Sequence, residues 1–218
     1  MAPLDPSAGS GLWVLASWEA VRMTKGRLEA FSDAVIAIIM TIMVLELHAP
    51  DGPELALLAP VIPAFLSYVL SFVFLGIYWN NHHHLLQAVQ QVNGTVLWAN
   101  LHLLLWLSFI PFVTSWLGSS GFSAWPVALY GVVMLFSGSA FLLLSRALVA
   151  LHGQQSQIAT ALGRDFKGKL SLVSYLIAIP LAFLAPWLSC AVYVSVAAVW
   201  LIPDRRIERA VRSGPARG

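Results

Sequence analysis

The sequence predicts an all-α, polytopic membrane protein with six transmembrane helices and both termini in the cytoplasm. Of its 218 residues, 59% are hydrophobic and only 10% are charged, whereas soluble domains carry about 25% charged residues. The charges are gathered in short stretches, which leave long uncharged apolar runs between them. Because a soluble core does not need so much continuous apolar chain, we expect these runs to lie in a lipid bilayer.

Apolar runs separated by polar turn residues define six candidate spans, at residues 31–47, 55–79, 96–117, 127–151, 170–185 and 187–202. The last two belong to one uncharged stretch, residues 170–202. A single helix of that length would be about 50 Å long, which exceeds a hydrocarbon core of about 30 Å. Pro180 and Pro186 provide places to bend, so we expect two short helices joined by a tight turn.

The 12 Lys and Arg residues all fall on one side of this arrangement. They precede the first span, close the fourth and flank the last pair: Arg22, Lys25, Arg27, Arg146, Arg164, Lys167, Lys169, Arg205, Arg206, Arg209, Arg212 and Arg217. The opposite loops carry Glu46, Asp51 and Glu54 instead. The positive-inside rule therefore places both termini in the cytoplasm, and it requires the last stretch to cross the bilayer an even number of times.

The chain divides into three parts by composition. Residues 1–22 are expected to be a disordered or interfacial extension, because their apolar patch is too short to span a bilayer and lacks the features of a secretory signal. Residues 23–205 form the six-helix transmembrane domain, and residues 206–218 form a basic cytoplasmic tail. The net charge of +2 is too small to indicate nucleic-acid binding, and the single cysteine, Cys190, excludes an intrachain disulfide.

The first span carries an acidic residue, Asp33, near its cytoplasmic boundary. A carboxylate costs about 2.5–3.5 kcal/mol at mid-bilayer and less toward the interface, so a partner is expected. One alternative is that Ser32 and Asp33 cap the start of the helix. Arg27 lies six residues away, on a different face, so an ion pair within the helix is excluded. The partner of Asp33 should therefore come from another helix.

Ile38, Thr41, Ile42 and Leu45 fall within an arc of about 100° on the same helix. This face could be ordinary helix–helix packing, with the Thr41 hydroxyl bonded to its own backbone. The alternative is that it lines a pathway, and the pattern by itself favours packing. Periodicity alone leaves both alternatives open.

Three consecutive histidines, His82, His83 and His84, end the second span. Successive side chains point about 100° apart, so at most two could share a metal, and haem held between this cluster and His102 is a further alternative. We expect instead that one or two of these histidines, with Trp79, make polar contacts with Asp33. No resident metal or cofactor is expected.

Two motifs resemble one known family. The first span reads Arg27-x-x-x-Phe31-Ser32-Asp33, then Ile38-x-x-Thr41 and Leu45-Glu46, and the second ends Trp79-x-Asn81-His82-His83. The third span contributes two further pairs that match the same family, Asn100-Leu101 and Pro111-Phe112. Together these are similar to the signature of the lysosomal and prokaryotic potassium channel family, over about residues 22–205.

The resemblance implies a homotetramer that conducts K⁺ through a pore lined by the first helices. It implies a hydrophobic constriction from Ile38 and Leu45, a selectivity layer from Thr41, and Ile42 at the edge of the pore face. It also implies a cytoplasmic network that holds the pore helix, formed by Arg27, Phe31, Ser32, Asp33, Trp79, His82 and His83. A third histidine in the second span, and the extra N-terminal residues, depart from the family pattern.

Other functions are less well supported. A cation- or proton-coupled transporter would show internal repeats and ionisable residues at mid-span, and the sequence shows neither. Enzyme motifs such as H-E-x-x-H and G-x-S-x-G are absent, and the G-x-x-x-x-G-K match at residues 163–169 lacks the following Ser or Thr. The resemblance thus implies a bacterial plasma-membrane channel, in which Glu46, Asp51 and Glu54 would attract cations to the outer mouth.

Overall fold

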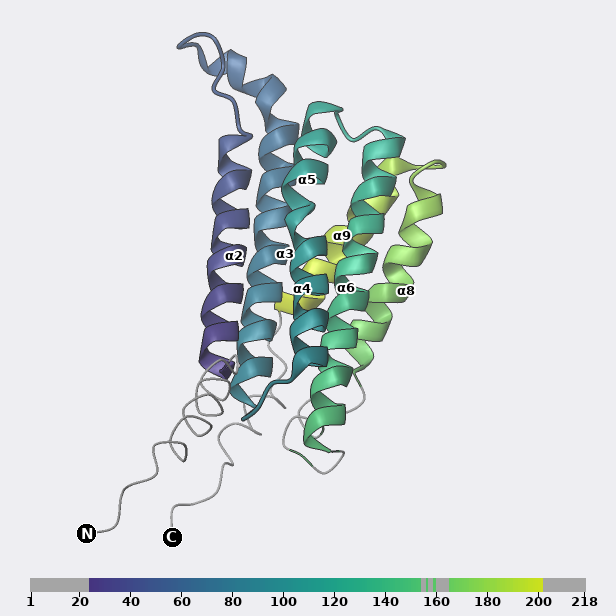
Figure 1. Cartoon of the computed structure of the whole chain (residues 1–218). Coiled ribbons are helices and arrows are strands. Elements are labelled where there is room, and N and C mark those ends of the chain that lie inside the picture. Colours follow the sequence, from purple (N-terminus) through teal and green to yellow (C-terminus); the bar gives the residue numbers. More distant parts are fainter. Residues whose placement is uncertain (1–23, 154–155, 157–158, 160–164, 202–218) are drawn as a thin grey trace, which may run out of the picture.

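The computed structural model describes residues 24–153, 156, 159 and 165–201, and in these residues the regular structure is entirely helical (Figure 1). The elements are α2 (Lys25–Leu45), the 3₁₀ helix η1 (Leu55–Val61), α3 (Ile62–Gln87), α4 (Gly94–Ser108), α5 (Ile110–Ser119), α6 (Ala124–His152), α8 (Phe166–Leu181) and α9 (Pro186–Leu201). The predicted extension at residues 1–22 and the predicted tail at residues 206–218 lie outside the described residues.

Helix α2 begins earlier than its apolar run suggests. Thr24 is its N-cap, and the Thr24 side chain accepts a hydrogen bond from the backbone N–H of Arg27. The predicted span begins at residue 31, because hydropathy excludes the charged residues Lys25, Arg27 and Glu29. In the structure these three residues belong to the first turns of the helix. Ser32 and Asp33 lie in the second and third turns, so the alternative in which they cap the helix is wrong.

The third predicted span is two helices rather than one. Helix α4 ends at Ser108 and α5 starts at Ile110, with Pro111 in the first turn of α5. Proline has no backbone N–H and its ring clashes with the preceding turn, so the helix axis is interrupted here. The break borders a groove beside α2, which is described below.

The last apolar stretch folds as two helices of 16 residues each, α8 and α9. Pro186 begins α9, and the turn at residues 182–185 joins the two helices. The Ser189 hydroxyl of α9 donates to the Ala178 carbonyl of α8 at 2.8 Å, and the Tyr193 hydroxyl donates to the Val127 carbonyl of α6 at 3.0 Å. These buried bonds hold the pair together and against α6.

Four helical segments of the described chain are long and apolar enough to cross a membrane. They are Lys25–Leu45, Leu55–Gln87, Gly94–Ser119 and Ala124–His152, while Pro186–Leu201 is a shorter apolar helix. The protein is thus an all-α integral membrane protein. The count of six spans, which adds α8 and α9, and the cytoplasmic position of both termini remain predictions.

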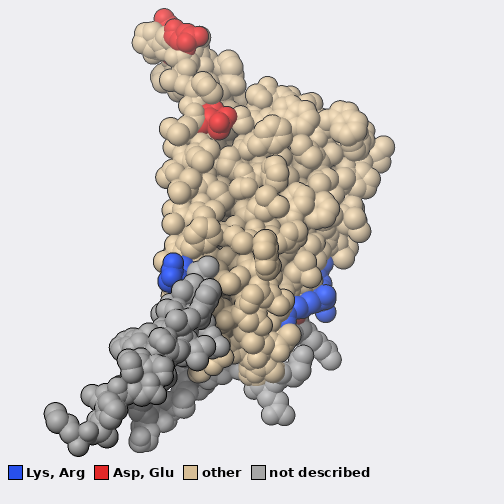
Figure 2. Space-filling model, viewed as in Figure 1, with Lys and Arg blue, Asp and Glu red and all other residues tan. Residues whose placement is uncertain are grey.

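Charge separates along the bundle. The described Lys and Arg side chains lie at one end, whereas Glu46, Asp51 and Glu54 lie at the other (Figure 2). We refer to these as the basic end and the acidic end. Helix α2 occupies one edge of the bundle and α8 the opposite edge, and the segment around η1 projects beyond the acidic end (Figure 1). Helix α2 packs against α3, α4 and α5 only on its inner side.

A close approach between α3 and α5 depends on Gly118. A Cβ atom at this position would lie 2.8 Å from the Ser67 hydroxyl oxygen and 3.0 Å from the Ala64 Cβ of α3. Both distances are shorter than ordinary van der Waals contact, so the two helices can approach this closely only where α5 has no side chain.

Replacement of Gly118 by alanine should therefore destabilise the bundle. Overpacking at such a contact lowers the free energy of unfolding by about 1–3 kcal/mol, which thermal unfolding in detergent would detect. Gly76→Ala in α3 is the matched control, because nothing lies within 4 Å of its Cβ position. Equal melting temperatures for the two variants would show that the α3–α5 contact does not require glycine.

Candidate functional site

Helix α2 has two opposite faces. Its inner face is buried against the neighbouring helices and consists of Leu28, Ser32, Ile36, Ile39 and Met43. Its outer face is exposed: Ile38 retains 56% of its accessible surface and Leu45 retains 75%. Within one copy of the chain, the predicted pore face of α2 is therefore largely exposed.

The exposed face contains a regular stripe. Steps of four and three residues alternate along it, through Arg27, Phe31, Ala34, Ile38, Thr41 and Leu45, and every one of these residues is exposed. The five steps average 3.6 residues, which is the repeat of an α-helix, so the six residues share one face of α2. We call these six residues the α2 stripe. This face of α2 is open in the described part of the chain.

Thr41 occupies the middle of the stripe. Its hydroxyl donates to the Ile38 carbonyl of the preceding turn at 2.8 Å. Because the only hydroxyl proton is used in this bond, the lone pairs of the oxygen face outward and are available to a cation. The expected backbone bond and a role in ion coordination are therefore compatible.

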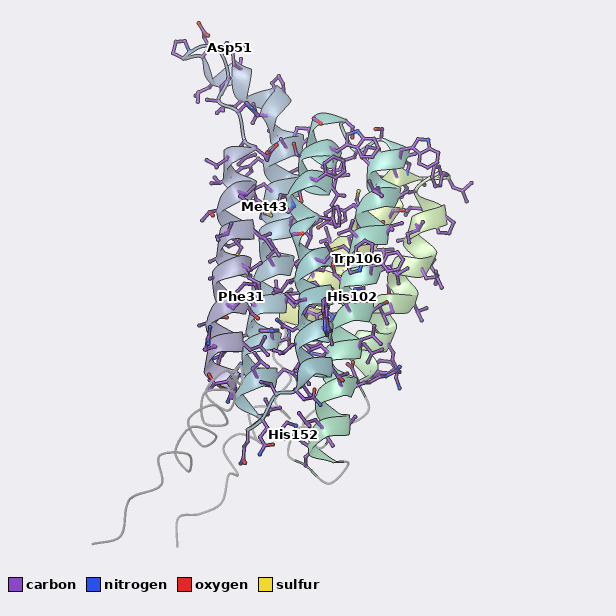
Figure 3. The ribbon with its side chains drawn as sticks, in the orientation of Figure 1. Phe31, Met43, Asp51, His102, Trp106 and His152 are labelled. Carbon is purple, nitrogen blue, oxygen red and sulfur yellow. The ribbon has the colours of Figure 1, made fainter. Side chains whose placement is uncertain are left out.

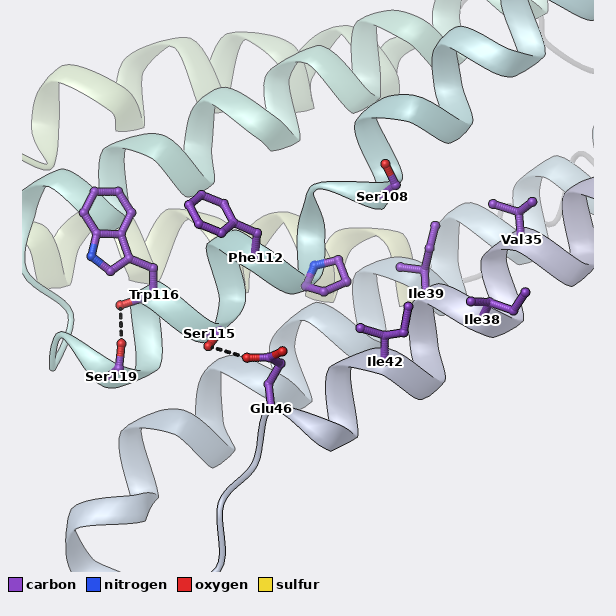
Figure 4. Close-up of a pocket in the computed structure, with 11 residues that line it drawn as sticks. Val35, Ile38, Ile39, Ile42, Glu46, Ser108, Phe112, Ser115, Trp116 and Ser119 are labelled. Atoms are coloured by element: carbon purple, nitrogen blue, oxygen red, sulfur yellow. Dashed lines mark hydrogen bonds between the residues drawn. The ribbon is translucent and has the colours of Figure 1, made fainter.

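A groove runs between α2 and the α4–α5 break (Figure 4). Its volume is about 810 Å³, and it is lined by Val35, Ile38, Ile39, Ile42, Glu46, Ser108, Pro111, Phe112, Ser115, Trp116 and Ser119. Near its acidic end, the Ser115 hydroxyl donates to Glu46 at 2.9 Å. This bond connects the last turn of α2 to α5, so Glu46 has a structural contact in addition to its predicted role at the mouth.

Toward the basic end, a buried hydrogen-bond chain joins α2, α4 and α3. The Ser32 hydroxyl donates to the Leu28 carbonyl at 2.8 Å, and the Asn100 amide donates to the Ser32 oxygen at 2.9 Å. The Asn100 carbonyl oxygen lies 2.8 Å from His82 Nε2. Ser32, His82 and Asn100 are completely buried.

The order of donors in this chain fixes the state of His82. The Ser32 hydroxyl donates its single proton to the Leu28 carbonyl, so it can only accept from Asn100. The amide nitrogen of Asn100 therefore faces Ser32, and its carbonyl oxygen faces His82. His82 therefore carries its proton on Nε2. Its Nδ1 is buried and has no hydrogen-bond partner in the described part of the chain, so a second proton there would have no acceptor. This geometry selects the neutral imidazole.

A second set of contacts fastens the surface of α2 to α3. Three pairs face each other, namely Lys25 with Gln87, Glu29 with His83 and Asp33 with Trp79. Each step of four residues along α2 is matched by a step of four back along α3, as expected for antiparallel helices in a fixed register. We call these pairs the α2–α3 ladder.

The rungs of the ladder differ in chemistry. Trp79 Nε1 donates to Asp33 Oδ1 at 3.0 Å, and Lys25 Nζ donates to the Gln87 carbonyl at 3.4 Å. His83 Nδ1 lies 3.2 Å from Glu29 Oε1. The Trp79 and His83 rings stack with centroids 5.8 Å apart, so adjacent rungs support each other. The partner of Asp33 does come from another helix.

Not every predicted network residue joins these contacts. No histidine hydrogen-bonds Asp33, because His82 turns inward to Asn100 and His83 turns to Glu29. Arg27 is exposed and forms no side-chain bond to another described residue, and Phe31 is 48% exposed. Both belong to the α2 stripe. Their expected role in holding the helix within one chain is therefore not seen.

The three predicted outer carboxylates are separated. Glu46 ends α2, whereas Asp51 lies on the segment that projects beyond the bundle (Figure 3). Glu54 immediately precedes η1. All three are exposed. The part of the chain that the structure describes contains no group of three His, Cys, Asp or Glu side chains able to hold a metal.

An all-helical membrane protein with an unpartnered stripe on one helix fits the class of channel subunits. Residues 27–111 match the family described as the endosomal/lysosomal potassium channel TMEM175. A potassium channel from Chryseobacterium sp. (strain P1-3) is 50% identical over 190 residues, which cover 87% of this chain and 99% of that protein. A potassium channel from Streptomyces collinus is 35% identical over 124 residues, 53% of this chain and 60% of that protein.

The fold agrees with a solved structure. The crystal structure of a homologue of the lysosomal potassium-selective channel TMEM175, from Chamaesiphon minutus, matches with a TM-score of 0.67 and 25% sequence identity. The match covers 84% of this chain and 97% of that chain. This chain belongs to the TMEM175 potassium channel family, whose members are ion channels and not enzymes.

Replacement of Asn100 by alanine should destabilise the protein. The change leaves His82 Nε2 buried without its acceptor, at a cost of about 1–3 kcal/mol, and it also removes the bond that the Ser32 oxygen accepts, while the Ser32–Leu28 bond remains. Asn80→Ala, at an exposed position of α3, should change the free energy of unfolding by less than about 0.5 kcal/mol. Thermal unfolding compares the pair, and similar melting temperatures would contradict the role given to Asn100.

Two substitutions at Asp33 separate the contribution of its hydrogen bond with Trp79 from that of its negative charge. Asp33→Asn keeps an oxygen acceptor for Trp79, whereas Asp33→Leu removes it. We expect faster amide hydrogen exchange in the first three turns of α2 for the leucine variant, and near-normal exchange for the asparagine variant. Equal acceleration in both would indicate that the carboxylate charge, and not the hydrogen bond, holds α2.

Proposed function

We propose that this protein is the pore-forming subunit of a potassium channel, with four copies of α2 around the ion pathway. The observation that carries the proposal is the α2 stripe, an exposed row of mostly apolar residues on a helix that the rest of the chain packs from behind. Membership in the TMEM175 family supports the choice of potassium, since the bacterial relatives are named potassium channels. Their bacterial origin supports a bacterial membrane as the location.

The residues of the stripe suggest how the pathway works. Four Ile38 and four Leu45 side chains would form two hydrophobic rings, which block ions by excluding water when they are narrow. Four Thr41 oxygens between these rings would replace some of the water molecules that a cation loses when it enters the constriction. Ile42 borders both the stripe and the groove, so it would pack at the edge of the pathway.

Opening requires α2 to move relative to the rest of its own subunit. At the basic end, the α2–α3 ladder and the buried Ser32–Asn100–His82 chain resist that movement. At the acidic end, the Glu46–Ser115 bond is the polar contact of α2 with α5. We therefore expect α2 to pivot or rotate about its better-anchored basic end. Glu46, Asp51 and Glu54 would raise the local cation concentration outside the mouth.

Flux measurements on purified protein in liposomes test this proposal. Wild type should pass K⁺ in preference to Na⁺ down a simple gradient. Thr41→Val removes the oxygen layer and should bring the two permeabilities toward equality. Ile38→Asn replaces an apolar ring with a polar one and should increase the leak, because the constriction stays wet.

Matched controls separate pore effects from general damage. Ile177→Asn introduces the same change at an exposed position of α8, at the opposite edge of the bundle, and should leave conduction unchanged. Flux that occurs only against an opposing proton or sodium gradient would identify a coupled transporter instead. If wild type passes no ions, or if Ile38→Asn and Ile177→Asn behave alike, α2 does not line a pore.

A further inference from the structure

A second group of charged side chains lies far from α2. The described cations fall into two patches at the basic end (Figure 2). One consists of Lys25 and Arg27 on α2, and the other consists of Arg146, Lys167 and Lys169 on α6 and α8. The second patch takes no part in the site described above.

Helix register places Arg146 next to the start of α8. Helices α6 and α8 pack against each other, and Gly138 of α6 faces Leu172 of α8, with 2.9 Å between its Cβ position and Leu172 Cδ2. One turn nearer the basic end, Leu142 and Gly168 line the same small cavity. Because the two helices run in opposite directions, Lys169 is level with Phe141 of α6, and Arg146 lies five residues, or about 7.5 Å along the axis, nearer the basic end.

Arg146 and Lys169 are exposed, and neither has a carboxylate partner among the described residues. The nearest carboxylate on α8, that of Asp165, is committed to capping this helix. It accepts from the backbone N–H of Gly168 at 2.9 Å, and it lies so close that a Cβ at position 168 would collide with it. Positive charge therefore prevails at this corner of the bundle.

The same corner presents apolar side chains to its surroundings. Phe166 is 71% exposed, and an exposed apolar strip continues from it along the membrane-facing side of α6 and α8 through Leu143, Leu170, Val173, Leu176 and Ile177. Cations at the end of an apolar, lipid-exposed strip lie at the depth of lipid headgroups. Since α8 is at the opposite edge from α2 (Figure 1), this corner faces lipid and not the proposed ion pathway.

We propose that Arg146 and Lys169 bind the phosphate of an anionic phospholipid, whose acyl chains lie along Phe166 and the strip on α8. Arginine binds phosphate oxygens through two parallel N–H groups, and lysine adds a compact second charge. A lipid is favoured over a soluble phosphate because the two cations stand open beside an apolar surface and are not enclosed in a pocket. One lipid at this position would bridge α6 and α8.

Lipid binding to the purified full-length protein tests the proposal without any ion flux, so its outcome is independent of the channel function. Native mass spectrometry with phosphatidylglycerol and phosphatidylcholine gives the affinities. Arg146→Gln and Lys169→Gln should each weaken phosphatidylglycerol binding about fivefold and leave phosphatidylcholine binding unchanged. Arg27→Gln removes an equal charge from the other patch and should keep the wild-type preference.

Three results would overturn the proposal. If a variant that combines Arg146→Gln and Lys169→Gln binds phosphatidylglycerol as wild type does, these two residues do not form the lipid site. An equal loss in Arg27→Gln would indicate a general attraction of positive charge to the membrane surface. Competition by soluble glycerol phosphate at similar concentrations would identify a site for soluble anions. Wild-type protein adds a test that needs no variant, because binding of phosphatidylglycerol, but not of phosphatidylcholine, should weaken as salt is raised.

Discussion

The one-sided attachment of α2 is the constraint on which the rest of the arrangement depends. Polar groups in a bilayer interior need partners within the protein, and in α2 these partners all lie on the inner side or on the flank next to α3. Ser32 bonds to Asn100, and Asp33 bonds to Trp79. The remaining face carries Arg27 and Phe31 near the basic end, followed by aliphatic residues and one threonine whose proton is satisfied by its own backbone. A helix built in this way is held firmly by the rest of its chain and leaves one face open.

The two sets of contacts that hold α2 differ in character. The Ser32–Asn100–His82 chain is fully buried and requires one order of donors, so it fixes the position of the helix sharply. The α2–α3 ladder lies at the surface, where each polar contact contributes less. A buried pivot beside weaker surface contacts is an arrangement that permits rotation about a defined point without separation of the helices.

Much of this architecture could be predicted from the residues. Hydropathy located the helices, proline positions indicated the α8–α9 pair, and the helical wheel of the first span placed Ile38 and Leu45 on one face. The sequence missed what depends on register between helices. Asn100 was noticed only as part of a motif, and the pairing of Glu29 with His83 could not be read because periodicity within one helix does not set its offset against another. The recurrence of polar residues every four positions in both helices was a usable signal. Arg27 and Phe31 were assigned to the network by resemblance alone, and the fold places them on the open face instead.

The unequal lengths of neighbouring helices have a consequence for the surrounding lipid. Helix α8 contains 16 residues, or about 24 Å of helix, beside α6, whose 29 residues extend for about 43 Å. A hydrocarbon core of about 30 Å matches neither. A bilayer crossed by α8 would have to become thinner along this side of the protein, which would make the fold sensitive to membrane thickness there. Acyl-chain length then becomes a physical variable of the cell membrane that acts on this fold through hydrophobic mismatch.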